Sequence, residues 1–173
     1  WWYDDSLVQK YNLDVQSVKT MDDLTAIFKT VKEGEGDSFY PVYLTQGNPW
    51  NGFFNNYDDL CSGLGGLVGV QIADDTRKVV VPLEQEDITH NLGLLHQWYQ
   101  AGYINPDANV SGEDYKNCFF GSGQAWPSAS IAQASNQGVE KYDYVEVGAP
   151  LYTSGTIQGS LNCISKNSKN PDA

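Results

Sequence analysis

The stretch Phe119–Ile131, read FFGSGQAWPSASI, places two aromatic residues before a turn rich in helix breakers. Gly121 and Gly123 are separated by one serine, and Trp126 stands directly before Pro127. A serine-rich segment follows and can begin a helix. The tryptophan of such a stretch either packs in the core beside the turn or lies at the mouth of a strand-to-helix turn, where its ring faces a ligand.

Two strongly amphipathic helices lie upstream of this stretch. Thr20 is expected to cap the first, because Asp23 follows three residues later, close to a capping box. Its apolar residues recur at helical spacing: Leu24, Ile27, Phe28 and Val31. The second helix is predicted over Glu86–Ala101 and ends at Gly102. Its expected inner stripe is Ile88, Leu92, Leu95 and Tyr99, flanked by Trp98.

Short apolar runs between the helices predict strands. They are Trp1–Tyr3, Phe39–Leu44, a hairpin of Val68–Ile72 with Lys78–Val81, Tyr142–Ala149 and Leu161–Ser165. Further helices are expected at Leu7–Tyr11, at Asp58–Leu67, from Ser128 to about Gln137, and in a short segment ending at Gly121, with Tyr115, Cys118 and Phe119 inward. Alternation of strands and helices predicts an α/β fold.

The composition is that of a soluble globular chain. Its 173 residues are 40% hydrophobic and 18% charged, which favours one domain with a core of useful size. No run approaches the roughly 20 apolar residues that span a bilayer. The net charge of −12 argues against nucleic-acid binding, which needs clustered Lys and Arg.

Aromatic residues with a polar atom predominate, since 5 Trp and 11 Tyr stand against 6 Phe. Such rings suit surfaces that are partly hydrated and partly stacked, as carbohydrate sites are. A second aromatic loop, Thr45–Tyr57 (TQGNPWNGFFNNY), follows the strand expected at Phe39–Leu44. Ligands of open α/β sheets lie beyond the carboxyl ends of strands, and Asn side chains both donate and accept hydrogen bonds. The loop is therefore a ligand-site candidate, with a plain Asn-rich turn as the alternative.

Neither a metal nor another cofactor is expected. His90 and His96 are six residues apart and do not share a helix face as a metal pair would. The run from Asp107 to Gly112 opens like a calcium loop, but its twelfth position is Cys118 instead of a bidentate Glu. No nucleophile motif appears, but carboxylates are plentiful, and a glycosidase pair, which is defined by its separation in space, stays open. The three cysteines lack a CxxC pair and are interpreted as small buried residues: Cys61, Cys118 and Cys163.

Three segments occur in an informative order: YQAGYINPD at 99–107, Gly121–Pro127, and SKNSKNPD at 165–172. With the strand and helix order, they resemble the extracellular solute-binding proteins of ABC transporters, the group that includes maltose-binding and other oligosaccharide-binding lipoproteins. The chain looks closest to a lipoprotein branch found in Gram-positive bacteria. The resemblance covers essentially the whole chain.

The resemblance implies a binding protein and not an enzyme, with a type II periplasmic-binding-protein fold in which two α/β lobes joined by a hinge enclose a solute. Residues 1–173 would then be a single lobe, the second, excised between two hinge crossings. It would have a mixed, mostly parallel sheet with helices on both faces. The implied partners are the first lobe, an oligosaccharide-like solute and a membrane permease, and the complete protein would be lipid-anchored outside the cytoplasm.

Carried over by position, the implied ligand contacts lie in three loops: Trp50, Asn51 and Phe53; Trp126; and Thr156 and Gln158. Two other functions stay open from the sequence. One is a fragment of a carbohydrate-active enzyme or a carbohydrate-binding module, although a β-sandwich module would lack the two amphipathic helices. The other is a binding lobe for peptides or another small solute on the same fold.

Overall fold

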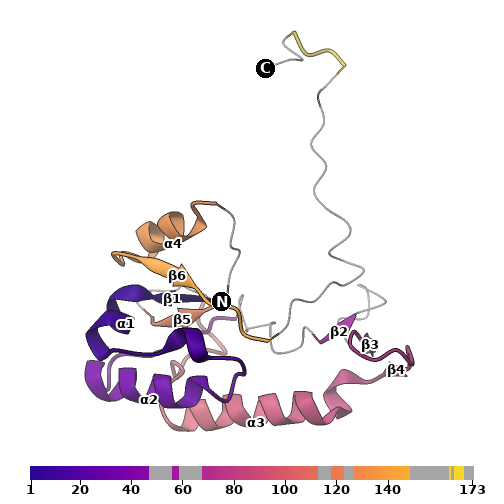
Figure 1. Ribbon diagram of the computed structural model, residues 1–173, viewed down its shortest axis with the longest axis horizontal. Helices are drawn as coiled ribbons and strands as arrows, with labels where there is room; N and C mark the ends of the chain where they lie inside the picture. Colours follow the sequence, from indigo (N-terminus) through magenta and orange to yellow (C-terminus); the bar gives the residue numbers. More distant parts are fainter. Residues whose placement is uncertain are drawn as a thin grey trace.

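Strand β1 (Trp2–Asp4) is the centre of a three-stranded sheet that joins three distant parts of the chain. It pairs antiparallel with β5 (Phe120–Gly121) on one side and β6 (Tyr142–Tyr144) on the other (Figure 1). The computed structural model describes residues 1–46, 56–58, 68–112, 118–122, 127–148, 164 and 166–169. The strand predicted at the start of the chain is confirmed, shifted by one residue.

Helices cover both faces of this sheet, as predicted. Successive strand side chains point to opposite faces, so Trp2 and Tyr3 enter different cores. Trp2 packs with Cys118, Tyr142 and Ala134 of α4 (Ala129–Gln137). Tyr3 belongs to the larger core, formed with α2 (Leu24–Glu35) and α3 (Glu86–Gln100) on the other side.

Phe28 on α2 is the centre of the larger core. Its ring meets Trp98 edge-on with 4.9 Å between centroids, Phe120 at 5.6 Å and Phe119 at 6.3 Å. All four rings are fully buried. Edge-to-face contacts at these distances add to the free energy gained from burying the rings.

Aspartate carboxylates accept hydrogen bonds at the start of the first two helices. The carboxylate of Asp4 accepts a hydrogen bond from the Ser6 amide at the start of α1 (Asp5–Tyr11). Before α2, the Asp23 carboxylate accepts from the Thr20 amide and hydroxyl, both at 2.9 Å. The predicted cap is wrong in its other half, because α2 has Asp23 at its N-cap position and the Thr20 hydroxyl donates to Asp23 instead of accepting from a helix amide. Helix α2 ends at Gly36, whose φ of +89° is a conformation that favours glycine.

Helix α3 spans the predicted residues, but its buried face is rotated from the predicted stripe. Ile88, Leu94 and Trp98 are buried, whereas Leu92 is 40% and Tyr99 is 44% exposed. Leu94 and Trp98 are four residues apart, but Ile88 is six residues from Leu94, so the buried positions cover a wider part of the helix surface than the predicted stripe. The large Trp98 side chain fills the core beside Phe28 and donates from Nε1 to Thr25 Oγ1 at 2.9 Å.

The segment predicted as strand Phe39–Leu44 contributes a single bridge residue. Val42 makes parallel bridges with Ile104 and with Phe120, and it follows Pro41 as expected for a strand start. The named strand pairs among the described residues are antiparallel, so the parallel pairing predicted for the sheet is limited there to these two bridges. The predicted α/β class and helix-covered sheet are confirmed.

Three other predictions need correction. The short helix expected to end at Gly121 is wrong at its end, because Phe120–Gly121 is extended and forms β5. Trp2 on β1 fixes this geometry, since its ring lies against Gly121. Strand β6 stops at Tyr144 and does not continue to Ala149. Asp58, expected in a helix, lies in β2 (Tyr57–Asp58), and residues 59–67 and 161–163 lie outside the described residues.

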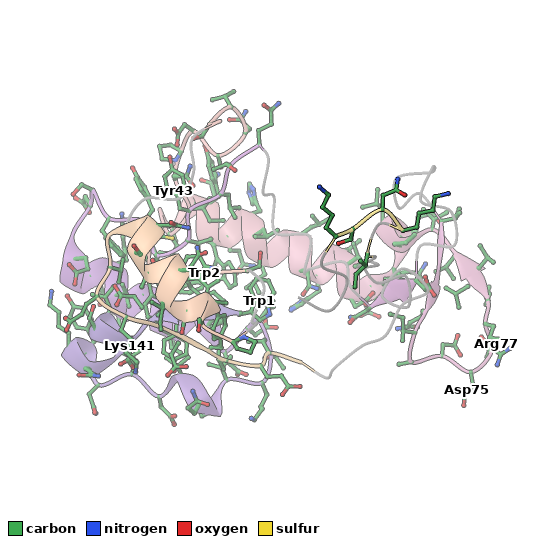
Figure 2. The ribbon with its side chains drawn as sticks, turned by 90° about the horizontal axis from the view of Figure 1, so that it is seen from above. Trp1, Trp2, Tyr43, Asp75, Arg77 and Lys141 are labelled. Carbon is green, nitrogen blue, oxygen red and sulfur yellow. The ribbon has the colours of Figure 1, made fainter. Side chains whose placement is uncertain are left out.

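A second antiparallel sheet, which we call the arm, lies at the N-terminal end of α3, far from β1 (Figures 1 and 2). It consists of β2, β3 (Gly69–Gln71) and β4 (Val79–Val80) in that order. The predicted hairpin is β3–β4, and β2 was not predicted. Figure 2 shows Asp75 and Arg77 at the tip of the arm, at the other end of the molecule from Trp2 and Lys141. A 3-10 turn at Pro82–Glu84 (η4) leads from β4 into α3.

Cys118 is free and buried, and burial raises the pKa of its thiol to about 12. This supports the interpretation of that cysteine as a small apolar core residue. Cys61 and Cys163 lie outside the described residues.

Candidate functional site

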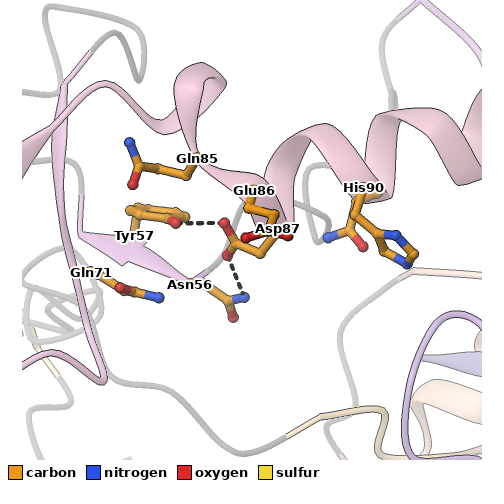
Figure 3. A pocket seen from close by; sticks show the side chains of 8 residues that line it. Asn56, Tyr57, Gln71, Gln85, Glu86, Asp87 and His90 are labelled. Atoms are coloured by element: carbon orange, nitrogen blue, oxygen red, sulfur yellow. Dashed lines mark hydrogen bonds between the residues drawn. The ribbon is translucent and has the colours of Figure 1, made fainter.

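A polar pocket of about 630 Å³ lies between the arm and the first turns of α3 (Figure 3). Three separate parts of the chain line it: Asn56 and Tyr57 at β2, Gln71 at the end of β3, and the segment from Gln85 to Asn91. Its volume lies in the range typical of small-molecule sites. We call it the arm pocket.

Asp87 organises the arm pocket. One of its carboxylate oxygens, Oδ1, accepts from the Tyr57 hydroxyl at 2.6 Å and from the Ile88 amide at 2.9 Å. The other, Oδ2, accepts from the Asn56 side-chain amide at 3.3 Å, a longer contact. Asp87 lies in the first turn of α3, where the helix dipole stabilises negative charge. Burial, and then the hydrogen bond and charge of Asp87, raise the pKa of Tyr57, which stays protonated as a donor.

The other lining groups suit a ligand that both donates and accepts hydrogen bonds. Four primary amides line the pocket, from Asn56, Gln71, Gln85 and Asn91, together with the carboxylates of Glu86 and Asp87. Amides present donors and acceptors side by side, and carboxylates accept from hydroxyl groups. No Lys or Arg is among the described residues that line the pocket. The lining therefore favours a neutral, hydroxyl-rich ligand over an anion.

His90 closes the pocket on the side of α2. Its Nε2 lies 3.0 Å from both carboxylate oxygens of Asp22, in the turn before α2. Both side chains are more than half exposed, so solvent screens this pair and it contributes little stability. The contact ties the start of α3 to the start of α2.

A smaller pocket of about 440 Å³ lies between α4 and β6. Its lining includes Ile131, Ala134, Val139 and Tyr142, with fewer hydrogen-bonding groups than the arm pocket. No cluster of three His, Cys, Asp or Glu side chains able to hold a metal occurs in the described part of the chain. Among the described helices, none combines the length and hydrophobicity needed to span a bilayer.

All six predicted ligand contacts lie outside the described residues: Trp50, Asn51, Phe53, Trp126, Thr156 and Gln158. Two of their loops are bounded by described residues. Asn56 directly follows 47–55, and it lines the arm pocket. Ser122 directly precedes 123–126, and its carbonyl accepts from Trp2 Nε1 at 3.0 Å. The sheet thus anchors one end of the Trp126 segment.

The sequence analysis did not predict the arm pocket. Glu86 and Asp87 lie in the first turn of a helix, where acidic residues are expected. Their presence there gave no sign that they also line a pocket. The one local signal was the Asn-rich end of the second aromatic loop, at Asn55–Asn56. Gln71 comes from another strand, and only the pairing of β2 with β3 brings it close.

The chain is similar to carbohydrate-binding proteins of ABC transporters, so the resemblance seen in the sequence is confirmed, although the matches cover 63–66% of the chain and not its whole length. No family model matches it. A curated relative, the carbohydrate ABC transporter substrate-binding protein of Streptococcus pneumoniae serotype 4, is 27% identical over 114 residues. That match covers 63% of this chain and 21% of the relative.

Two solved structures of the N-glycan transport solute-binding protein NgtS from Streptococcus pneumoniae share this fold. The complex with Man5GlcNAc matches with a TM-score of 0.57 and the complex with Man1GlcNAc with 0.55, both at 26% identity. Each match covers 66% of this chain and 24% of NgtS. The chain therefore spans about a quarter or less of the length of these relatives.

Proposed function

We propose that this chain is one lobe of the substrate-binding component of an ABC importer, where it supplies half of a cleft for an oligosaccharide. The observation that carries the proposal is the match in fold and sequence to NgtS, solved with two mannose-containing glycans. The abundance of Trp and Tyr and the amide-rich arm pocket support a neutral, hydroxyl-rich solute. The function is binding and delivery, without chemical conversion of the solute.

In this proposal, residues 1–173 form a single lobe, the second, and the first lobe belongs to the same protein. Hinge closure around the solute would present a closed surface to the permease in the membrane. The complete protein would lie outside the cytoplasm with a lipid anchor. The ligand contacts we propose are those predicted from the sequence: Trp50, Asn51, Phe53, Trp126, Thr156 and Gln158.

Stacking on tryptophan gives the expected size of the effect. An aromatic side chain can bury about 150–250 Å², and a sugar covering one face gains about a third to a half of that value. At about 25 cal/mol per Å², stacking of a sugar on one tryptophan contributes about 1–3 kcal/mol. Loss of one such tryptophan should therefore weaken binding by roughly 10- to 100-fold.

The test is titration calorimetry of the complete protein with a glycan panel that includes Man1GlcNAc, Man5GlcNAc, maltohexaose and a neutral peptide. We expect at least one oligosaccharide to bind saturably. We also expect this oligosaccharide to be recovered chemically unchanged after incubation with the protein. Binding of the peptide alone would contradict the proposal, as would hydrolysis of a bound glycan.

Site placement is tested separately with Trp50→Ala and Trp126→Ala, each expected to weaken binding by roughly 10- to 100-fold. The matched control is Tyr99→Ala, which removes an exposed ring from the outer face of α3. If both tryptophan variants bind like the control, the proposed contacts are wrong. The isolated 173-residue chain should bind far more weakly than the complete protein, because half of the cleft is missing; equally tight binding would contradict the half-site arrangement.

A further inference from the structure

We propose that the arm pocket is a separate subsite for one neutral sugar unit of a longer oligosaccharide. The six residues proposed above as ligand contacts do not include any of its lining. This inference rests on the proposed function and adds to it a second contact region, whose occupancy depends on ligand length. The residues that line the pocket indicate the chemical class of the ligand. The sequence position of Asn56, directly after 47–55, relates the pocket to the contacts proposed there.

The chemistry of the lining excludes other common ligands. Two carboxylates, with no Lys or Arg among the described lining residues, oppose the binding of phosphate, sulfate or an acidic sugar. A calcium ion needs six to eight oxygen ligands, and one oxygen of Asp87 is already held by Tyr57 and Ile88. The pocket is also poorly suited to an apolar group, because its described lining is mostly amides and carboxylates and the ring of Tyr57 is buried.

The second oxygen of Asp87 is the strongest acceptor available to a sugar hydroxyl. Its contact with the Asn56 amide is 3.3 Å long, and the Asn56 side chain is exposed. A ligand hydroxyl can therefore insert between these groups, donating to Asp87 and accepting from Asn56. Because the other oxygen stays bound to Tyr57 at 2.6 Å, the carboxylate keeps its orientation when the ligand arrives. Such a fixed group loses little conformational entropy on binding.

Gln71 supplies a contact from the opposite wall. It is the last residue of β3, paired with Tyr57, and its side chain is half-buried. Figure 3 shows the side chains of Gln71 and Asn56 on the same side of the pocket, beneath the Tyr57 ring. One amide directly before β2 and one at the end of β3, facing a carboxylate on a helix, can bind two or three hydroxyl groups of one sugar ring.

The position of the pocket gives the dependence on ligand length. Asn56 directly follows 47–55, which holds three of the proposed contacts. Because Phe53 is three residues from Asn56, at most about 11 Å along an extended chain, a long oligosaccharide can occupy both regions, whereas a short one can occupy only one of them. The arm pocket should therefore add affinity for long oligosaccharides only.

The experiment compares Man1GlcNAc with Man5GlcNAc, and maltose with maltohexaose, by titration calorimetry on the complete protein. The variants are Asn56→Ala, Gln71→Ala and Asp87→Asn. Their matched controls are Asn109→Ala and Gln97→Ala, which remove exposed amides away from the pocket. For a bound pair, we expect the pocket variants to weaken the longer glycan by roughly 5- to 50-fold, as expected for one or two hydrogen bonds, and to leave the shorter one within about twofold.

Affinity for the shorter glycan also reports whether each variant is folded. If the pocket variants affect the longer glycan no more than the controls do, this inference is overturned while the proposed function stands. Equal weakening of both lengths also overturns it, because the pocket then belongs to the main site or acts through folding. If the unmodified protein binds no oligosaccharide, the proposed function fails and this inference fails with it.

Discussion

The side chain of Asn105 bonds to both backbone groups of Leu44. Its Oδ1 accepts from the Leu44 amide at 2.8 Å, and its Nδ2 donates to the Leu44 carbonyl at 2.9 Å. Nδ2 also donates to Asp107 Oδ1 at 2.8 Å, so each polar group of the amide has a partner. Asn105 is 1% exposed and directly follows Ile104, which bridges Val42. The Asn105 side chain thus extends the pairing between the two segments from Val42 to Leu44.

Replacing Asn105 by Ala should destabilise the fold by about 2–4 kcal/mol, because two backbone groups of Leu44 lose their partners in a half-buried place. Asn109→Ala is the control, since Asn109 is exposed within the turn that follows Asn105. Urea denaturation followed by tryptophan fluorescence measures both. A loss below about 0.5 kcal/mol for Asn105→Ala would show that water replaces the amide.

Gly121→Ala tests the contact between β5 and β1. A Cβ at Gly121 would lie 2.3 Å from Cζ2 of Trp2, whose ring is 1% exposed and packs against Tyr142. The ring has no room to move, so overpacking should cost about 1–3 kcal/mol. The matched substitution is Gly93→Ala, at an exposed position within α3 with nothing within 4 Å.

Gly93→Ala should instead stabilise the protein by about 0.5–1 kcal/mol, because alanine restricts the unfolded chain and favours helix. Thermal unfolding of the two glycine variants should shift the melting temperature in opposite directions. Shifts of the same sign would contradict the packing of Trp2 against β5.

Leu94→Ala and Leu92→Ala decide which face of α3 is buried. Leu94 is 5% exposed and belongs to the larger core, so its truncation should cost about 2–5 kcal/mol. Leu92 is 40% exposed and should lose less than about 1 kcal/mol. The unfolding free energies in urea provide the comparison. A larger loss of stability for Leu92→Ala than for Leu94→Ala would show that the stripe predicted from periodicity is the buried one.

The cap before α2 should make stability depend on pH. Hydrogen bonds from the backbone amides of Lys19 and Thr20 lower the pKa of the Asp23 carboxyl below its ordinary value. A carboxyl with a lowered folded-state pKa stabilises the fold above its unfolded pKa of about 3.9, and this contribution is lost as pH falls through the folded pKa.

Asp23→Asn should therefore lower stability at pH 7, and the difference from the unmodified protein should shrink once the pH falls below about 4. Unfolding free energies measured across this range provide the test. Asp75→Asn at the tip of the arm removes the same charge and controls for net charge. A difference that is constant across the pH range would show that the carboxylate does not act as the predicted cap.

Local sequence patterns predicted the helices, and the order of short segments predicted the family that the chain resembles. Helical periodicity, Asp23 and Gly36 define α2, and the same kind of local signal defines the bounds of α3 and the start of α4. These features depend on residues a few positions apart, so they are readable without a fold. The order of short segments such as 99–107 and 121–127 likewise indicated a sugar-binding relative of ABC transporters.

The contacts between segments distant in the sequence depend on the folded chain. Strands β1, β5 and β6 have two or three residues each, and more than 100 residues separate β1 from either neighbour. Such short strands carry little local signal, so their pairing depends on packing. The buried face of α3 was decided in the same way, because Trp98 fits beside Phe28 and Tyr99 does not enter the core. The arm pocket needs Asn56, Gln71 and Asp87 together, and these come from three elements that only the folded chain joins.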